Sequence, residues 1–352
     1  MKRLILMALS VLLLLSSCGR PAAVYVLAER LALASASGKI MYGHQDDLMY
    51  GHTWNSSDNT DPGFTRSDIE MVCGQYPAIL GLDLGGIELG NAENLDGNNF
   101  DAMRAAAQAH VERGGIVTLS WHMRNPLTGG DTWDTSSTET VASILEGGEN
   151  HEKFLVWMDR MAEYVKSLGI PVIFRPFHEH SMNFFWWGSS CCTADEYNAL
   201  WKMAYQYIVE EKGLADMLWA ISPNACPDFM DWPQRYPGDD YVDLIGLDFY
   251  YFDDAFVENM KACLEFQKCF AEDHGKLLAL TETGYEGIPD PTWWTRTLLP
   301  AVQDYPIAFL LTWRNASDRP THFYGPYPGA ACEADFVEFC KSDKTLFIND
   351  IR

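Results

Sequence analysis

Eight short apolar runs recur along the chain, and longer segments with helical spacing of apolar residues separate them. The runs cover residues 40–44, 77–84, 116–122, 171–177, 217–222, 242–250, 276–281 and 307–313. One intervening segment, 99–113, places Phe100, Met103 and Ala107 on one helical face. This alternation is what one (β/α)8 barrel needs, and it contains too many strands for a typical doubly wound sheet. The sequence therefore predicts the α/β class and a single (β/α)8 TIM barrel over residues 38–352.

Polar or aromatic side chains stand at or just past the carboxyl-terminal ends of most runs. They are His44, Asp83, His122, Glu179, Asp248, Glu282 and Trp313. In a (β/α)8 barrel the carboxyl-terminal ends of the strands form the face that carries the active site. Any one of these residues alone could cap a helix or face solvent, but together they predict a site on one rim.

The charge balance restricts the ligands that such a site can bind. The chain has 25 Lys and Arg against 49 Asp and Glu, which gives a formal net charge of −24 at pH 7. Binding to phosphates depends on clustered Lys and Arg, so we expect no nucleic-acid partner. The sequence has no P-loop and no G-x-G-x-x-G turn, and His178-Glu179-His180 lacks the spacing of the zinc motif H-E-x-x-H. We expect a neutral ligand, and neither a metal nor an organic cofactor.

The first residues have the pattern of an export signal. Lys2 and Arg3 precede an apolar run over residues 4–15, which is too short to span a bilayer of about 30 Å. Leu15-Ser16-Ser17-Cys18 resembles a bacterial lipobox, in which the cysteine becomes the lipidated first residue. This resemblance implies a signal peptide over 1–17 and a lipid-anchored segment over 18–37, in a protein exported to the bacterial envelope. Because no acidic cluster follows Cys18, we favour the periplasmic face over the cell surface; the alternative is a secreted protein.

Two glutamates stand in contexts that suit acid–base chemistry. The first, Glu179, ends the motif Arg175-Pro-Phe-His-Glu and precedes an aromatic segment at 184–187. Apolar surroundings raise a carboxyl pKa and a nearby cation lowers it, and a proton donor at neutral pH needs the raised value. The second, Glu282, follows the apolar run 277–280 directly. A pair of carboxylates on either side of one bond is the usual equipment of glycoside hydrolysis.

Several spaced motifs together resemble glycoside hydrolase family 26, a family dominated by β-mannanases. The resemblance covers roughly residues 38–340 and rests on Gly43-His-Gln-Asp-Asp47, Ser120-Trp-His122, Arg175-Pro-Phe-His-Glu179, Phe185-Trp-Trp-Gly188, Gly246-Leu-Asp-Phe-Tyr250, Thr281-Glu-Thr-Gly284 and Leu311-Thr-Trp-Arg314. Members belong to a barrel superfamily whose acid/base and nucleophile follow strands 4 and 7. The resemblance thus implies that Glu179 is the acid/base and Glu282 the nucleophile of a retaining double displacement.

The resemblance also implies a set of substrate-binding residues. They are His122 and His178 at the cleavage point, Phe184 and Trp187 in the aromatic segment, Tyr250 beside the nucleophile, Trp313 under the reactive ring and Arg314 at the sugar beyond it. Met182 and Phe184 stand where the family usually has Gly and Trp, which predicts altered contacts on the leaving-group side. We treat His44, Asp83, Trp133 and Arg175 as rim candidates that are equally suited to structural roles.

The sequence therefore predicts a monomeric, lipid-anchored, retaining hydrolase of β-1,4-mannan, galactomannan or manno-oligosaccharides. One alternative is a retaining hydrolase of another β-glycan, such as xylan or mixed-linkage glucan. A second is a non-catalytic glycan-binding lipoprotein, against which the two intact glutamates argue. The sequence leaves open whether the enzyme cuts internally or releases short products from a chain end.

Overall fold

The computed structural model describes residues 20–55, 63–224 and 231–351. In this part of the chain, parallel strands occupy eight positions around a barrel, which closes where the last position pairs with the first. The strands are β1 (Ile40–Gln45), β2 (Ile79–Asp83), β3 (Ile116–Ser120), β4 (Val172–Arg175), β5 (Met217–Ile221), β6 (Leu244–Ile245) with β7 (Asp248–Tyr250), β8 (Leu277–Gly284) and β9 (Ile307–Thr312). Each predicted run overlaps its strand, although β1 and β8 extend past the predicted ends to Gln45 and Gly284, and the (β/α)8 barrel is confirmed.

Two features distinguish this sheet from a barrel of eight continuous strands. The run at 242–250 is split, because Gly246 and Leu247 separate β6 from β7, and both pieces pair with β8. A further short strand, β10 (Thr345–Leu346), pairs with the first residues of β1. The split matters for the site, since the register of β7 sets Asp248 opposite Glu282.

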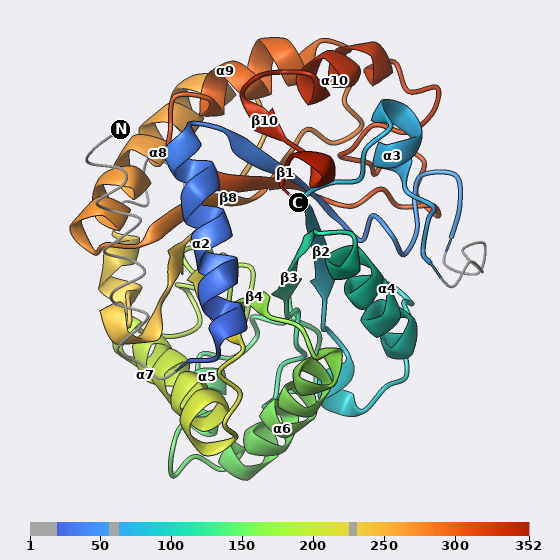
Figure 1. The fold of residues 1–352 in the computed structure, drawn as a ribbon. Coiled ribbons are helices and arrows are strands. Elements are labelled where there is room, and N and C mark those ends of the chain that lie inside the picture. Colours follow the sequence, from blue (N-terminus) through green and yellow to red (C-terminus); the bar gives the residue numbers. More distant parts are fainter. Residues whose placement is uncertain (1–19, 56–62, 225–230, 352) are drawn as a thin grey trace.

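Helices surround the strands (Figure 1). They are α3 (Asp68–Cys73), α4 (Phe100–Glu112), α5 (Thr140–Ile144), α6 (His151–Leu168), α7 (Ala194–Tyr205), α8 (Phe256–Asp273), α9 (Leu299–Val302) and α10 (Glu333–Cys340). Short helical turns of other pitch lie at Ile87–Leu89, Gln206–Glu211, Trp232–Arg235, Asp239–Tyr241, Trp294–Leu298 and Ile348–Asp350. Local sequence explains several starts: Thr193 and Glu196 form a reciprocal cap at α7, as a Thr-x-x-Glu pattern predicts.

A further helix, α2 (Ala22–Ser37), closes the amino-terminal end of the barrel. Val24, Leu27 and Leu31 lie on one side of it and are buried against apolar residues at the starts of the strands. The sequence analysis began the catalytic domain at residue 38 and treated 18–37 as a preceding segment. The packed body instead reaches back to Arg20, because helical spacing in this segment buries an apolar face.

The predicted signal peptide at 1–17 and Cys18 lie outside the described residues. None of the helices that the structure describes has the length and apolar character needed to cross a membrane.

Candidate active site

A cavity of about 490 Å³ lies at the carboxyl-terminal ends of the strands. Both predicted catalytic carboxylates, Glu179 and Glu282, line it. Its other walls are mostly aromatic, with Trp133, Phe184, Phe185, Tyr250, Tyr251, Phe252, Tyr285, Trp313 and Tyr324 alongside His122, Glu286 and His322. Glu179 is 8% exposed and Glu282 4% exposed, so each carboxyl group is nearly shielded from bulk water. The cavity has the make-up of a sugar site, where apolar sugar faces stack on rings and polar groups meet hydroxyls.

Glu282 is held by two side chains that donate hydrogen bonds to its carboxylate oxygens. The hydroxyl of Tyr250 donates to Oε2 of Glu282 at 2.7 Å, and the guanidinium of Arg175 pairs with Oε1. Arg175 is itself fixed by Asp248, whose Oδ2 lies 2.8 Å from Nη1. The hydroxyl of the neighbouring Tyr251 donates to Asp254 instead, so Tyr250 is the tyrosine of this pair that contacts Glu282. Glu282 is thus an oriented carboxylate of the kind that can attack a sugar carbon.

Glu179 sits on a backbone that turns sharply after β4. Both Phe177 and Glu179 have positive φ angles, of 49° and 53°, a conformation that costs free energy in non-glycine residues and that clusters at functional sites. The amide of Glu179 donates to the carbonyl of Ser222 at 2.7 Å, which stabilises the turn. Burial, followed by the negative charge of Glu282, raises the pKa of Glu179 well above its ordinary range. A carboxyl group that stays protonated in this way can act as a general acid.

Asn224 is a site residue that the sequence analysis missed. Its side-chain amide donates to Oε1 of Glu179 at 2.7 Å. It lies just past the predicted run 217–222, so the rule that strand ends face the site would have found it. An asparagine after a strand is also a common turn residue, so its position alone does not distinguish the two roles.

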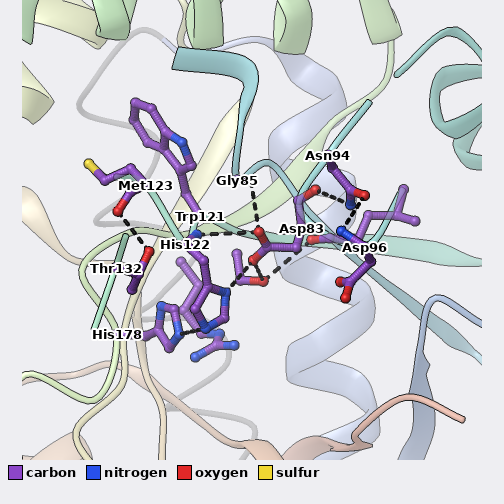
Figure 2. A network of polar contacts seen from close by, with 12 residues as sticks. Asp83, Gly85, Asn94, Asp96, Trp121, His122, Met123, Thr132 and His178 are labelled. Carbon is purple, nitrogen blue, oxygen red and sulfur yellow. Dashed lines mark hydrogen bonds and ion pairs between the residues drawn. The ribbon is translucent and has the colours of Figure 1, made fainter. Parts of the chain in front are cut away.

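Asp83 organises the histidines on the opposite wall, and Figure 2 shows this network. Its Oδ2 lies 2.7 Å from Nδ1 of His122, and the hydroxyl of Ser120 donates to the same oxygen at 2.6 Å. Burial lowers the pKa of His122, but the charge and hydrogen bond of Asp83 outweigh it, and the net pKa is raised. His122 is therefore oriented as a hydrogen-bond donor toward the cavity wall.

His178 also belongs to this network, but its pKa is shifted in the opposite direction to that of His122. Its Nε2 lies 3.2 Å from Nε2 of His122. Burial, followed by the charge of Arg175, holds the pKa of His178 well below its ordinary value. The opposite shifts assign the shared proton to His122, which donates to a neutral His178.

The sequence profile of glycosyl hydrolase family 26 matches residues 31–318. The chain belongs to this family. A mannan endo-1,4-β-mannosidase of Bifidobacterium adolescentis is 30% identical over 339 residues, which cover 88% of this chain and 34% of that protein. The chain thus spans about a third of the length of that relative. A mannan endo-1,4-β-mannosidase of Bacillus subtilis is 29% identical, with 76% of this chain and 75% of that protein covered.

Solved structures of family 26 enzymes share the fold. A family 26 β-mannanase from Bacteroides ovatus is 42% identical and superposes with a TM-score of 0.87, covering 91% of this chain and 94% of that one. The catalytic domain of a family 26 endo-β-1,4-mannanase from Bacillus sp. JAMB-750 is 32% identical, with a TM-score of 0.85 and coverage of 94% and 93%. The resemblance inferred from the motifs is confirmed at the level of the family.

In this family 26 site, several predicted residues form the cavity walls. Trp313 lines the cavity, and Trp133 stacks on the ring of His122 at 5.6 Å between centroids. Phe184 lines it near Glu179. Arg314 lines a second cavity of about 330 Å³, where its Nη2 lies 3.2 Å from Asp96. The predicted sugar contact of Arg314 stays a prediction.

Three predicted contact residues lie behind the walls of the family 26 cavity. Trp187 is fully buried, and its indole donates to the carbonyl of His178 at 2.7 Å, so its predicted direct contact with substrate is corrected to a supporting role. The physical reason is that Trp187 packs inward against Phe177, a direction that a run of aromatic letters does not reveal. His178 is only 1% exposed and does not line the cavity, so its predicted sugar contact is corrected to a supporting contact with His122. His44 is buried beside Asp47, 2.9 Å away, and does not line the cavity.

Proposed function

We propose that this family 26 protein hydrolyses β-1,4-mannan, galactomannan or manno-oligosaccharides with retention of configuration. The observation that carries the proposal is the pair of unlike carboxyl groups in one cavity. Glu179 has a raised pKa, whereas Glu282 accepts hydrogen bonds from Tyr250 and Arg175. The mannanase names of the similar proteins support the choice of mannan as substrate.

Each carboxyl group has one role in each half of the reaction. In the first half Glu282 attacks the anomeric carbon, the bond to the leaving oxygen breaks, and Glu179 gives its proton to that oxygen. In the second half Glu179 takes a proton from water, the water oxygen attacks the same carbon, and the bond to Glu282 breaks. Arg175 and Tyr250 hold Glu282 in place throughout, because both contact its oxygens.

The walls suggest how the sugar chain runs through the cavity. The reactive ring stacks on Trp313, and His122, whose two nitrogens pair with Asp83 and His178, lines the wall beside it. The preceding sugar reaches the second cavity, with Arg314 and Asp96. The leaving sugar lies on the other side, near Phe184, because Glu179 must reach the departing oxygen.

We also propose that the protein is monomeric, exported and anchored to the bacterial envelope through a lipid on Cys18, on the periplasmic side. The basic start, the short apolar run and Leu15-Ser-Ser-Cys18 support this proposal. Mass spectrometry of the amino-terminal peptide tests it, with a lipidated Cys18 expected. An unmodified protein that retains residues before Cys18 would contradict it.

Sugar release from β-mannan, xylan and mixed-linkage glucan tests the activity. We expect the wild type to prefer mannan, and Glu179→Gln and Glu282→Gln to lose on the order of 10³-fold in kcat on mannan while melting near the wild-type temperature. Glu265→Gln, on the surface of α8, is the matched control and should keep full activity. Near-normal mannan hydrolysis by Glu282→Gln would overturn the proposal. Chromatography of products from manno-oligosaccharides of defined length then distinguishes internal cutting from release at a chain end.

A further inference from the structure

Helix α2 crosses the end of the barrel that is opposite to the catalytic cavity. In Figure 1 it is the blue helix that runs across the strands, and it contacts β1, β5, β8 and β9. Its buried residues meet the starts of the strands, such as Met41 and Ile116, whereas Glu179 and Glu282 lie at their far ends. The helix α6, of 18 residues, spans about 27 Å and runs alongside the barrel. The two ends are therefore separated by roughly the thickness of a domain.

The chain is fixed to this end just before α2 begins. Arg20 is 8% exposed, and its Nη1 lies 2.8 Å from Oδ2 of Asp243. Its Nη2 also donates to the hydroxyl of Tyr205 at 3.1 Å. Cys18 precedes Arg20 by two residues, and two residues of extended chain reach at most about 7 Å. A lipid on Cys18 must therefore emerge close to the end that α2 covers, and it cannot reach round to the cavity.

The outward side of α2 carries large exposed apolar side chains and few carboxylates, although the protein as a whole is acidic. Val26 is 55% and Leu33 59% exposed, and both are large apolar side chains. Glu29 is the one carboxylate in the sequence of this fully described helix, and the guanidinium of the following Arg30 donates to the backbone carbonyls of Gly114 and Ile351. Lys39, just after the helix, lines a shallow hollow beside Leu33. Exposed apolar side chains with a lysine beside them are a composition that favours a phospholipid interface.

We infer that the outer face of α2, made up of Val26, Glu29 and Leu33, lies against a phospholipid bilayer, so that the catalytic cavity opens away from the membrane. The inference rests on the proposed lipidation of Cys18, because an acyl chain brings this end of the barrel to the bilayer surface. Long glycans then approach the cavity from the aqueous side without obstruction by lipid. The apolar contact, rather than charge attraction, orients the body, which is consistent with its net charge of −24.

Energy transfer to a labelled membrane tests this orientation. The full-length lipidated protein is placed in vesicles of phosphatidylethanolamine and phosphatidylglycerol that contain a headgroup-labelled acceptor lipid. A fluorescent amino acid replaces either Ser37, exposed at the α2 end, or Thr135, exposed near Trp133 on the cavity side. We expect transfer from position 37 to exceed transfer from position 135 several-fold. Equal transfer, or stronger transfer from position 135, on vesicle-bound protein would overturn the orientation alone. Protein that stays in the supernatant, with no transfer from either position, would overturn the lipid anchor and the orientation together.

A charge-insertion variant tests the role of the α2 face separately. Val26→Asp with Leu33→Asp changes two exposed side chains, so the fold and the hydrolysis of soluble manno-oligosaccharides should be retained. We expect the ratio of the two transfer signals to fall severalfold, while the anchor on Cys18 keeps it above one. Val156→Asp, at a position 48% exposed on α6, is the matched control and should leave the ratio unchanged. An unchanged ratio in the double variant would overturn the assignment of this face to the bilayer.

Discussion

The side-chain amide of Asn224 donates a hydrogen bond of 2.7 Å to Oε1 of Glu179. This contact stabilises the ionised carboxylate and so opposes the burial that raises the pKa of Glu179. The balance between the two effects sets the pH above which the acid loses its proton. Two hydrogen bonds thus link the end of β5 to Glu179, which follows β4: one accepted by the carbonyl of Ser222 and one donated by the side chain of Asn224.

Removal of the amide of Asn224 should shift the alkaline limb of the activity profile. In Asn224→Ala the ionised form of Glu179 loses a hydrogen bond of about 1.5–3 kcal/mol, so its pKa rises further. Because the acid must be protonated to act, the alkaline limb of kcat/KM should move up by about one pH unit or more. The measurement is kcat/KM on a manno-oligosaccharide across pH. A limb that moves to lower pH would show that Asn224 does not stabilise the ionised form.

The hydroxyl of Tyr250 should contribute far more to catalysis than the hydroxyl of Tyr251. Tyr250→Phe removes a 2.7 Å hydrogen bond to Glu282, and we expect kcat/KM on mannan to fall by about 10- to 100-fold. Tyr251→Phe removes only a bond to Asp254 and should have a much smaller effect. Equal losses in the two variants would contradict the tyrosine register in the site.

The ion pair of Asp83 and His122 should make stability depend on pH. The pKa of His122 is raised in the folded protein, so the stabilisation is complete below its unfolded value of about 6.5 and is lost as pH rises through the folded value. Breaking a buried pair costs about 3–5 kcal/mol. Melting temperatures at pH 5.5 and pH 9 should therefore show a larger deficit for Asp83→Asn at pH 5.5. A deficit that is the same at both pH values would mean that His122 is neutral throughout.

Phe184 should act on the leaving-group side of the cleaved bond. Phe184→Ala removes a stacking surface worth about 1 kcal/mol, which predicts a rise of about fivefold in KM for long manno-oligosaccharides. Phe184→Trp should keep or improve the wild-type KM. An aryl mannobioside, whose leaving group is not a sugar, serves as the control substrate and should respond less. A larger effect of Phe184→Ala on the aryl substrate would contradict this placement.

The barrel and its two glutamates were predictable because they depend on local patterns. Eight apolar runs gave the strands, and residues at the ends of parallel strands share a rim by geometry alone. The contact between Asn224 and Glu179 and the direction of Trp187 were not predictable in this way. Asn224 meets Glu179 across 45 positions, and the direction of Trp187 depends on a turn with positive φ at Phe177 and Glu179. Helix α2 was not predicted. Its apolar residues follow closely on the apolar run of the predicted export signal, so the two segments are hard to separate by composition.

The central claim is that Glu282 forms a covalent bond to the sugar. Incubation with a 2-deoxy-2-fluoro-mannobiosyl fluoride slows the second half of the reaction, and mass spectrometry of the digested protein then locates any adduct. The account predicts one fluorinated disaccharide on the peptide that contains Glu282, and no adduct in Glu282→Gln. Turnover of mannan by a protein that never acquires this adduct, or an adduct on a different carboxylate, would contradict it.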